Sequence, residues 1–580
     1  MKNKIKLHVL HALCVSMILL SPLLTLGRTA ISDAFGTNMH LVARYYEEDW
    51  DTVLSKAKEA NVEWAREEFS WQTIEPVNDS FNFAPYDAAI NKYVANDINV
   101  LGLIAYSTEW ASTNGGSPDY EYYAPDMEAW EDYCTQLATR YQGKVAAWEI
   151  WNEPNVEQFW KSSEEDYVTL LETASSAIKE VDADAIIVLG GIAGTDTDFI
   201  DRIYSQVSSK DIFDVVAVHP YRLVGSSFNY APEKSVEGLN TLQIDLENLR
   251  AVMRKNDDIG KPVWLTEFGW TTYDDGISED MQADYLMRGY AMALSVINVR
   301  KVFWYTFRDD AENTAYLESS FGMIKRDFTN KDAVSTYSFL QNKLSNRKFS
   351  SGSLANPLLI DNFNHKNGWE FKGTVGADGQ LKENNHGKLK ISYTFNEATS
   401  SYLPISREFK LRHYTDAISF RAKGSDDSTN LRVRIKDATG EVFQYNVGYL
   451  PSTFTTFRIN FDDYFSSWGG DADGYLDEPL YFDSFVLDDN PDGSLAEGDV
   501  YFDDLVSSTK GEIYLYKYSE GKNKYYLIWS RENTQHKKIY LEDTNQIIER
   551  SLDSNTRIYG DNHYFSLNIT SRPKWLQVRS

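Results

Sequence analysis

The chain has 580 residues, of which 42% are hydrophobic and 25% charged, and its 57 Lys and Arg against 86 Asp and Glu give a net charge of -29. The apolar content, with 15 Trp, 37 Tyr and 29 Phe, excludes a disordered chain and predicts several folded domains. The negative charge excludes a nucleic-acid-binding protein, because phosphate recognition needs clustered Lys and Arg.

The first residues have the layout of an export signal. Lys2, Lys4 and Lys6 precede a mainly apolar run over 7–26, and Ala30 offers a small residue before a cleavage point. A signal peptide over 1–30 predicts a secreted or cell-surface protein with no membrane contact after cleavage. A retained anchor is the alternative, because the run is close to the roughly 20 residues that span a bilayer.

Over 31–347, short apolar strands alternate with longer amphipathic helices. The strands are expected at 34–40, 62–69, 100–106, 146–151, 186–190, 215–219, 263–268 and 302–307. Between them, apolar residues recur at helical spacing in segments such as 50–61, 164–181, 242–254 and 281–296. Eight such units predict an α/β fold, a closed (β/α)₈ TIM barrel. A doubly wound sheet would usually show a Gly-rich phosphate turn after its first strand, and none is present at 36–40.

The pattern changes after Arg347. A short polar stretch at 350–353 indicates a linker, and helical periodicity then disappears. The segments that follow alternate polar and apolar residues between Gly, Asp and Asn turns, which predicts a jelly-roll β-sandwich over 355–508. The same behaviour over 511–580 predicts a small β domain.

Two glutamates follow buried strands of the predicted barrel. Glu153 lies just after the fourth strand, in Trp-Asn-Glu-Pro at 151–154, and Glu267 ends the seventh, in Thr-Glu-Phe-Gly at 266–269. The C-terminal ends of the strands of a β/α barrel meet at one mouth, so we expect the two carboxylates to face each other across a cleft.

This pair resembles the catalytic signature of the clan A retaining glycoside hydrolases, which are (β/α)₈ barrels with an acid/base after strand four and a nucleophile on strand seven. Asn152-Glu153-Pro154 matches the Asn-Glu-Pro of the clan, and 266–269 matches its nucleophile strand. The resemblance covers the barrel from 36 to 304. The sequence context is most similar to family 39, which includes β-xylosidases, α-iduronidases and bacterial exopolysaccharide hydrolases.

The resemblance and the strand-end positions give seven candidate substrate-binding residues: His40, Arg66, Trp110, Asn152, His219, Tyr221 and Trp304. The resemblance implies that Arg66 lies beneath the nucleophile and that Trp304 forms an aromatic floor under the sugar. Each has a structural alternative when taken alone, such as a simple ion pair for Arg66 or a satisfied buried position for His219.

Glycoside cleavage explains why two carboxyl groups in different environments are needed. One must protonate the bridging oxygen while the other supplies a negative oxygen on the opposite face of the ring. We expect Glu267 to attack, ionised by Arg66 and Tyr221, and Glu153 to be the acid and then the base. A retaining mechanism predicts carboxyl groups about 5 to 5.5 Å apart. No catalytic cofactor is expected, because the scattered histidines show no metal-ligand spacing.

The predicted sandwich resembles jelly-roll carbohydrate-binding modules, whose first and last strands often hold a structural calcium ion. On that resemblance, Asp361 and Asp504 would be the ligands. A second acidic stretch, 471–478, has spacing suited to Ca²⁺ but lacks the full EF-hand pattern, so a solvated acidic loop is the alternative. A glycan platform would come from one of three aromatic residues: Trp369, Tyr445 or Trp468. The final β domain resembles the small sheet that packs beside barrels of this clan.

The sequence therefore predicts a secreted retaining glycoside hydrolase that cleaves a β-linked polysaccharide or oligosaccharide, such as an exopolysaccharide or a plant cell-wall glycan. Two alternatives stay open. A transglycosylase would use the same residues, and a noncatalytic glycan-binding or scaffold protein would keep the barrel for its shape. The glycan and its linkage, endo or exo action and the oligomeric state do not follow from the sequence.

Overall fold

The computed structural model describes residues 29–578 apart from 223–229, 235–240, 355–357, 385–387, 397–400, 412–414, 426–428, 490–496, 510–512, 532–534, 542–543, 545, 551–554 and 561–563. Nearly all of the predicted signal peptide lies outside the described residues. In the described part of the chain, no helix combines the length and the apolar composition that crossing a bilayer requires.

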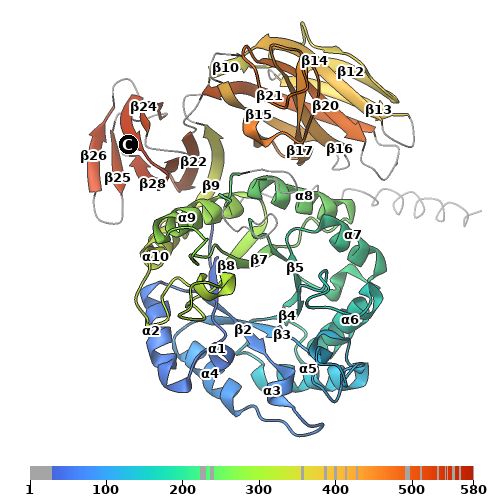
Figure 1. The fold of residues 1–580 in the computed structure, drawn as a ribbon, viewed down its shortest axis with the longest axis vertical. Coiled ribbons are helices and arrows are strands. Elements are labelled where there is room, and N and C mark those ends of the chain that lie inside the picture. The colour runs from blue at the N-terminus through green and yellow to red at the C-terminus, as the bar shows by residue number, and fades with distance from the viewer. Residues whose placement is uncertain are drawn as a thin grey trace, which may run out of the picture.

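Eight parallel strands close into a barrel, paired in chain order with β8 returning to β1, and Figure 1 looks into the ring that they form inside the helices. The strands are β1 (Phe35–Asn38), β2 (Trp64–Phe69), β3 (Asn99–Ile104), β4 (Ala147–Asn152), β5 (Ile187–Ala193), β6 (Val216–His219), β7 (Val263–Phe268) and β8 (Val299–Trp304). Each overlaps a predicted strand, and the predicted TIM barrel is confirmed. The largest displacement is at β8, which begins and ends three residues earlier than expected.

The helices of the outer ring are α1 (Leu41–Arg44), α2 (Trp50–Glu59), α3 (Trp71–Ile74), α4 (Ala84–Ala95), α5 (Met127–Tyr141), α6 (Glu164–Val181), α7 (Thr197–Gln206), α8 (Leu242–Lys255), α9 (Glu279–Ser295) and α10 (Asp332–Leu344). Hydroxyl caps fix several of their starts. The side chains of Ser163, Thr241 and Ser278 each accept a hydrogen bond from a backbone N–H three residues on, and Asp166 completes a capping box with Ser163.

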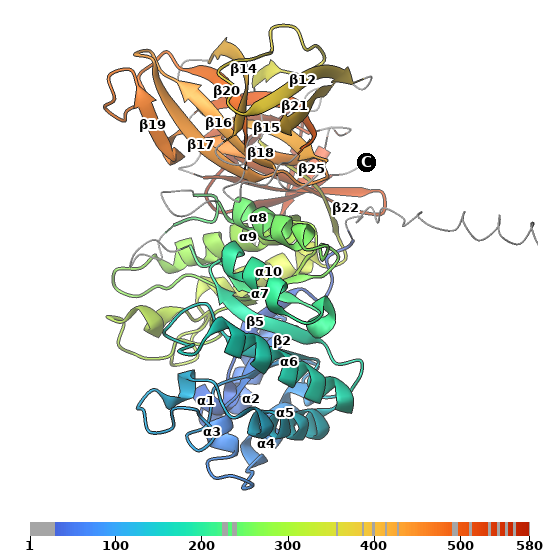
Figure 2. The same cartoon turned by 90° about the vertical axis from the view of Figure 1, so that its right-hand side faces the viewer.

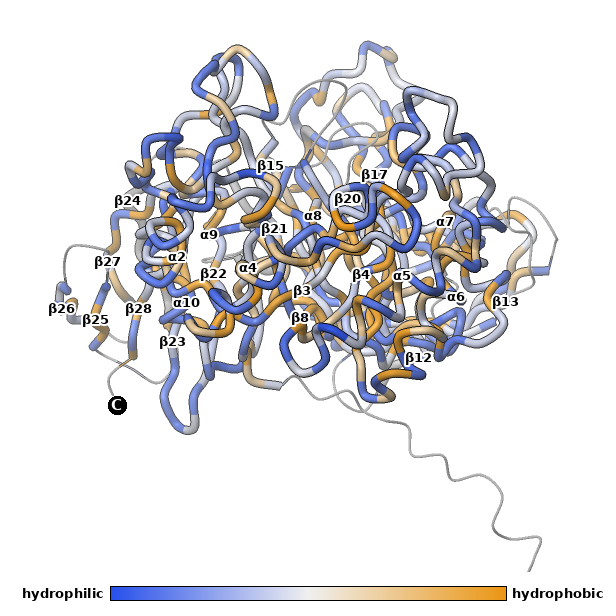
Figure 3. Tube along the Cα trace, turned by 90° about the horizontal axis from the view of Figure 1, so that it is seen from below, coloured by the Kyte–Doolittle hydropathy of each residue, from blue (hydrophilic) through white to orange (hydrophobic). Residues whose placement is uncertain are grey.

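Large apolar side chains fill the N-terminal half of the barrel. Trp64, Trp264 and Phe303 are buried there, with the rings of Trp64 and Trp264 packed edge to face at 5.4 Å. A Cβ on Gly36 would lie 2.4 Å from the ring of Phe303, so β1 needs glycine for this close packing. Figure 3 shows that hydrophobic stretches gather in the middle of the molecule, where β3, β4 and β8 lie, and that the outer loops are mostly hydrophilic. Because these apolar side chains fill the N-terminal half, the polar side chains of the barrel interior lie at its other end.

Two antiparallel sheets follow the barrel and face each other. One has β10 (Leu358–Asp361), β12 (Ala377–Asn384), β13 (Lys388–Phe395), β15 (Thr415–Gly424), β18 (Thr455–Asn460) and β21 (Glu497–Thr509); the other has β11 (Glu370–Phe371), β14 (Tyr402–Lys410), β16 (Thr429–Lys436), β17 (Glu441–Tyr449), β19 (Ser466–Gly469) and β20 (Tyr481–Asp489). Phe485 of β20 stacks on Phe502 of β21 with ring centres 4.2 Å apart, inside one shared core. The predicted β-sandwich is present.

The remaining strands show that the predicted linker at 350–353 was wrong. That stretch lies in β9 (Lys348–Leu354), which pairs with β22 (Ile513–Glu520). The whole sandwich lies between these two strands in the sequence. Phe349 of β9 packs against the rings of Tyr516 and Tyr518, and this contact, rather than the local serines and glycine, decides the strand. The sheet is completed by β23 (Asn523–Ser530), β25 (Gln546–Arg550), β26 (Asn555–Tyr559) and β28 (Lys574–Val578), beside the pair β24 (Gln535–Tyr540) and β27 (Tyr564–Ile569).

Helices α8 and α9 form the barrel surface on which the sheets rest, as Figure 2 shows. On the sandwich side, Asn248 of α8 accepts a hydrogen bond of 3.1 Å from the backbone N–H of Tyr449. On the side of the C-terminal sheet, the buried carboxylate of Glu233 accepts from Arg288 of α9 at 2.7 Å and from the indole of Trp529 at 3.1 Å. This buried ion pair joins β23 to the barrel.

Arg288→Met is expected to destabilise the protein by about 3 to 5 kcal/mol, because it leaves the Glu233 carboxylate buried without its cation. Urea unfolding followed by tryptophan fluorescence measures the loss. The matched control is Arg202→Met, which removes an exposed ion pair with Glu164 and should cost less than about 1 kcal/mol. Equal losses in the two variants would show that the pair does not anchor the sheet.

Candidate active site

A cavity of about 940 Å³ lies at the C-terminal ends of the barrel strands. Its lining includes both predicted catalytic glutamates and five of the seven predicted substrate-binding residues: His40, Arg66, Asn152, Glu153, His219, Tyr221 and Glu267. Side chains more than 200 positions apart in the sequence thus share one polar cleft, which is the arrangement that the strand-end argument predicted.

Arg66 is the hub of this cleft. Its guanidinium is 1% exposed and donates four hydrogen bonds, to Glu149 at 2.6 Å, Glu267 at 2.6 Å, Asn38 at 2.9 Å and Asn152 at 2.9 Å. Because a guanidinium stays charged and presents its donors in a fixed plane, it sets the positions of acceptors from β1, β4 and β7 together. The two interpretations weighed for Arg66, an ion pair and a group that orients Glu267, describe the same contacts.

Glu267 is held in its ionised form. One carboxylate oxygen accepts from Arg66, and the other accepts from the Tyr221 hydroxyl at 2.9 Å. Burial alone would favour the protonated acid, but the charges of His219 and Arg66 and the Tyr221 hydrogen bond hold the pKa of Glu267 below its ordinary value. A carboxylate fixed on both oxygens and kept charged is suited to nucleophilic attack.

Glu153 lies just beyond β4 in a left-handed conformation, with φ of 47°, and its backbone N–H donates to Gly191 at 2.8 Å. This turn directs its side chain to His219, whose Nδ1 lies 2.7 Å from Oε1 of Glu153. Burial disfavours a charged ring, but the negative charges of Glu267 and Glu153 raise the pKa of His219.

The hydrogen bonds around His219 determine where a proton must be. The hydroxyl of Thr266 donates its one hydrogen to Glu149 at 2.8 Å, so it can only accept at the 3.0 Å contact with Nε2 of His219. Nε2 is therefore protonated. The contact between Nδ1 and Glu153 then needs one further hydrogen, either on the imidazole or on the carboxyl group. The pair of Glu153 and His219 holds a proton that faces the cleft.

The two glutamates are close enough for the retaining geometry. An oxygen of Glu153, an oxygen of Glu267 and a ring nitrogen of His219 lie within 4.8 Å of one another. Retaining enzymes place the carboxyl groups about 5 to 5.5 Å apart, and inverting enzymes about 6.5 to 9.5 Å apart. The same three groups have the composition of a metal site, but the Arg66 guanidinium already contacts Glu267 and leaves little negative charge for a cation there.

Asn152 and His40 present hydrogen-bond donors to the cleft. The amide oxygen of Asn152 accepts from Arg66, which leaves its NH₂ group as the donor. Nδ1 of His40 accepts from the backbone N–H of Glu68 at 3.2 Å. Burial, with Arg44 and Arg66 nearby, holds the pKa of His40 well below its ordinary value. The ring is therefore neutral and protonated at Nε2, which can donate to a hydroxyl group.

The two remaining predicted residues do not line the cavity. Trp304 is fully buried, its indole donates to the backbone oxygen of Phe321 at 3.1 Å, and its ring lies 6.1 Å from that of Trp270. Neighbouring residues at a strand end point to opposite sides, so the aromatic side chain that faces the cleft is Tyr305. Trp110 is half-buried; its indole donates to the backbone oxygen of Glu75 at 2.9 Å, and its ring packs on Trp71. The structure therefore does not bring Trp304 or Trp110 into the lining of the cavity, and their contact with sugar stays a prediction.

Several residues of the site were missed by the sequence analysis. Glu149 is fully buried and accepts from Arg66, Thr266 and the backbone of Gly191. A charged residue in the middle of an apolar strand, four positions before Glu153, was the available signal, because a buried carboxylate needs partners.

A second missed group forms the rim of the cleft. Arg44 donates to Asp310 and to the Tyr305 hydroxyl at 3.0 Å, and Glu68 and Glu318 lie beside them. Burial raises the pKa of Glu68 and of Glu318 to about 7. Arg44 lies in α1, Glu68 lies near the end of β2 and the other three follow β8, and no recognisable motif joins them, so only the fold brings them together.

The predicted calcium ligands at the edge of the sandwich do not form a site in the described residues. The carboxylate of Asp361 accepts from Arg407 at 2.6 Å and from the indole of Trp369 at 3.2 Å. The carboxylate of Asp504 lies 3.8 Å from Arg421, and neither aspartate belongs to a group of converging ligand atoms among the described residues. The positive charge beside Asp361 is therefore the guanidinium of Arg407.

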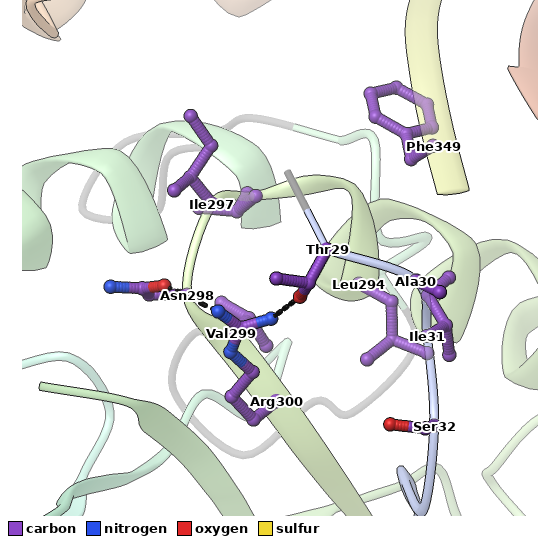
Figure 4. Close-up of a pocket in the computed structure, with 11 residues that line it drawn as sticks. Thr29, Ala30, Ile31, Ser32, Leu294, Ile297, Asn298, Val299, Arg300 and Phe349 are labelled. Atoms are coloured by element: carbon purple, nitrogen blue, oxygen red, sulfur yellow. Dashed lines mark hydrogen bonds between the residues drawn. The ribbon is translucent and has the colours of Figure 1, made fainter. Parts of the chain in front are cut away.

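A smaller cavity of about 370 Å³ lies at the opposite end of the barrel, beside the start of β8 (Figure 4). Its lining consists of Thr29 to Ser32, Leu294 and Val296 to Arg300, with Phe349 above. Its one charged side chain, Arg300, donates to Thr29 and Asn298. Without a carboxylate or a histidine in its lining, this cavity offers no acid–base chemistry.

Tyr221→Phe is expected to move the acidic limb of the kcat/KM profile upward by roughly one pH unit, because a hydrogen bond to a charged group contributes about 1.5 to 3 kcal/mol. The pKa of Glu267 is depressed in the intact site, so losing one donor raises it, and the nucleophile becomes protonated at a higher pH. Initial rates against pH measure the shift. Tyr46→Phe, at an exposed tyrosine, is the control. An unchanged or lowered acidic limb in Tyr221→Phe contradicts the assignment.

Comparison with known proteins supports the same interpretation of the barrel. The family model for cellulase (glycosyl hydrolase family 5) matches residues 27–307. A β-xylosidase of Geobacillus stearothermophilus is 24% identical over 214 residues, which cover 33% of this chain and 42% of that enzyme. The aligned part of the chain thus spans less than half of that relative.

Among solved structures, a family 39 glycoside hydrolase from Bacteroides cellulosilyticus WH2 matches with a TM-score of 0.57 and 16% identity, covering 95% of this chain and 81% of the other. This likeness extends the shared fold to the C-terminal sheets. A monomeric β-xylosidase from Caulobacter crescentus CB15 matches with a TM-score of 0.44 and 14% identity, covering 83% of this chain and 98% of the other. The family model is of family 5, whereas the solved structure with which this chain shares its fold is of a family 39 enzyme, and both are glycoside hydrolases. The chain contains the TIM barrel of a clan A glycoside hydrolase, followed by C-terminal β-sheets.

Proposed function

We propose that the protein is a retaining β-glycosidase that cleaves a β-linked polysaccharide or oligosaccharide by double displacement. The observation that supports this most directly is the pair of glutamates within 4.8 Å, each with different hydrogen-bond partners. Glu267 is fixed as an anion by Arg66 and Tyr221, and Glu153 shares a proton with His219. One carboxylate that attacks and one group that protonates are what glycoside cleavage requires.

In the first step, Glu267 attacks the anomeric carbon while Glu153 transfers its proton to the leaving oxygen, which gives a covalent glycosyl-enzyme and a free alcohol. In the second step, Glu153 removes a proton from water, which displaces Glu267 and restores both side chains. His219 stays hydrogen-bonded to Glu153 in both steps. The Asn152 amide donates to the 2-hydroxyl, where its contact strengthens as positive charge develops on the ring.

The substrate class that we propose to test first is the β-xylosides, because the relative from Geobacillus stearothermophilus is a β-xylosidase. The cleft presents aromatic surfaces for sugar C–H groups at Tyr106, Phe159, Tyr305 and Phe321. Its volume of about 940 Å³ exceeds what one monosaccharide fills, so we also propose oligosaccharides and soluble xylans as substrates.

The test is a panel of aryl β-glycosides and plant and bacterial polysaccharides, with the anomer released first identified by ¹H NMR. Retention predicts that the β-anomer appears first and then mutarotates. If the α-anomer appeared first, double displacement would be excluded. If no member of the panel released a sugar but the protein bound one, the noncatalytic alternative would be favoured.

We also propose that the protein is exported and that the sandwich binds glycan. The N-terminal lysines and apolar run support export, and N-terminal sequencing of protein recovered outside the cell would find a start near Ile31. Of the three aromatic residues considered as a platform, Trp369 and Tyr445 are buried, whereas Trp468 is 42% exposed. Trp468→Ala should therefore weaken retention on insoluble glycan, and unchanged retention would remove the proposed platform.

A further inference from the structure

Five carboxylates from two separate turns meet at one end of the sandwich. Asp437 and Glu441 flank the turn between β16 and β17, and Asp471, Asp473 and Asp477 lie in the loop that follows β19. Ligand oxygens of Asp437, Glu441 and Asp471 lie within 4.8 Å of one another, and so do those of Asp471, Asp473 and Asp477. Asp471 belongs to both groups and links them, so the two groups are adjacent.

The inner part of this cluster is buried and lacks a protein cation. Glu441 is fully buried and Asp437 is 2% exposed. Oε1 of Glu441 has no hydrogen-bond partner, while its other oxygen is 3.4 Å from the backbone N–H of Gly474. Within the described part of the chain, none of the five carboxylates forms an ion pair, and the adjacent Lys436 pairs with Glu408 instead.

A group of buried carboxylates without a cation lowers the stability of the folded protein. Burying an ionised carboxylate without a partner is strongly unfavourable, and the outer aspartates add like charges at short range. The local hydrogen bonds do not remove the charge, since those to Asp437 come from neutral donors, the backbone N–H groups of Thr439 and Glu441 at 2.9 Å. The buried, unpartnered oxygen of Glu441 therefore points to a cation held between the two turns.

We propose that this cluster binds one Ca²⁺ ion. All five candidate ligands offer oxygen atoms, which are the ligands of hard cations, and neither histidine nor cysteine is among them, which disfavours zinc. Ca²⁺ takes six to eight oxygens in a flexible geometry, and the five carboxylates supply a number of oxygens in that range when some of them bind through both oxygens. Mg²⁺ demands a stricter octahedron and keeps several waters, which suits a buried Glu441 less well.

Bound calcium would tie the turn before β17 to the loop after β19. Strand β19 is at the edge of its sheet, pairs only with β17 in the described structure and presents the exposed Trp468. The ion would thus fix the position of the surface that we propose for glycan contact. This site is distinct from the pair Asp361 and Asp504, and it does not depend on the chemistry of the barrel.

The experiment uses the full chain after treatment with EDTA and removal of the chelator. Calorimetric titration with CaCl₂ is expected to show one ion per chain, and Ca²⁺ should raise the melting temperature relative to EDTA, since a ligand specific for the folded state stabilises it. Tb³⁺ provides a second probe, because Tyr475, next to Asp473 and Asp477, would sensitise its luminescence. Absence of both binding heat and sensitised emission up to about ten millimolar metal would leave a solvated acidic loop and overturn the proposal.

Two variants and a control locate the ion. Glu441→Gln removes the buried charge, and Asp473→Asn alters an exposed residue that cannot disturb the core; each is expected to weaken Ca²⁺ binding by at least tenfold. Glu370→Gln, at an exposed position of β11 in the same sandwich, should bind Ca²⁺ like the parent. If Asp473→Asn also bound Ca²⁺ with parental affinity, this cluster would not be the site. Parental kcat in EDTA would show that the ion is structural.

Discussion

Glu267→Ala is expected to lower kcat/KM on aryl β-glycosides by about 10⁴-fold or more, because removing a nucleophile removes the covalent route altogether. The fold should be retained, since the side chain points into the cleft and is 12% exposed. Azide is small and anionic, and it can occupy the space that the carboxylate leaves beside Arg66. It should restore turnover and yield a glycosyl azide of inverted, α configuration. Stopped assays with and without azide, followed by NMR of the product, make the measurement.

Glu131→Ala is the matched control, because it makes the same substitution at an exposed position of α5 with no part in the cleft. It should keep parental kcat and show no response to azide. Parental activity in Glu267→Ala would refute the assignment of the nucleophile. Loss of activity without azide rescue, in a variant whose melting temperature is parental, would assign Glu267 a supporting role instead.

The barrel could be predicted from the sequence because its strands are buried on both faces. Such strands appear as short continuous apolar runs, and helical periodicity between them makes a parallel sheet the only consistent interpretation. The boundaries were less certain. At β8 the apolar run 302–307 suggested a strand three residues too far along, whereas pairing with β7 already begins at Val299 and pairing with β1 begins at Val302.

The catalytic pair could be predicted because its motif and its strand number agree, whereas the direction of individual side chains could not. Trp304 and Tyr305 are adjacent aromatic residues, and only the register of β8 determines that Tyr305 faces the cleft. Arg66 was predicted from the resemblance to the clan, and its position on the second strand supported that prediction. Its partner Glu149 was not, because no rule read from one sequence shows which charged residue will meet it inside a barrel.

Beyond the barrel, the sequence predicted sheets but not how they connect. Strand β9 was taken for a linker because serine and glycine dominate it, yet its pairing partner lies about 160 positions further on, in β22. The acidic loop 471–478 was visible, but Asp437 and Glu441, which complete the cluster, come from a separate turn. Contacts between segments that are distant in the sequence form both the strand β9 and the acidic cluster, and such contacts cannot be predicted from a local sequence pattern.

Glu153→Ala is expected to separate the two steps of the reaction. For substrates with poor leaving groups, such as alkyl glycosides or oligosaccharides, kcat/KM should fall by about 10² to 10⁴, the usual contribution of a general acid. For a dinitrophenyl glycoside, whose leaving group needs no proton, kcat/KM should stay close to the parental value. Its kcat should nevertheless fall, because the same residue is the base of the second step and the glycosyl-enzyme on Glu267 accumulates.

Azide makes the contrast with Glu267→Ala decisive. In Glu153→Ala the glycosyl-enzyme still forms on Glu267, and azide attacks it from the side that Glu153 and its contact with His219 occupied. The product should be the β-glycosyl azide, of retained configuration, whereas Glu267→Ala gives the α-azide. The same anomer from both variants, or an equal loss for good and poor leaving groups in Glu153→Ala, would show that the two carboxylates do not divide the work as proposed. Because the two products differ only in which face of the sugar is attacked, their configurations locate Glu153 and Glu267 on opposite sides of the bond that is cleaved.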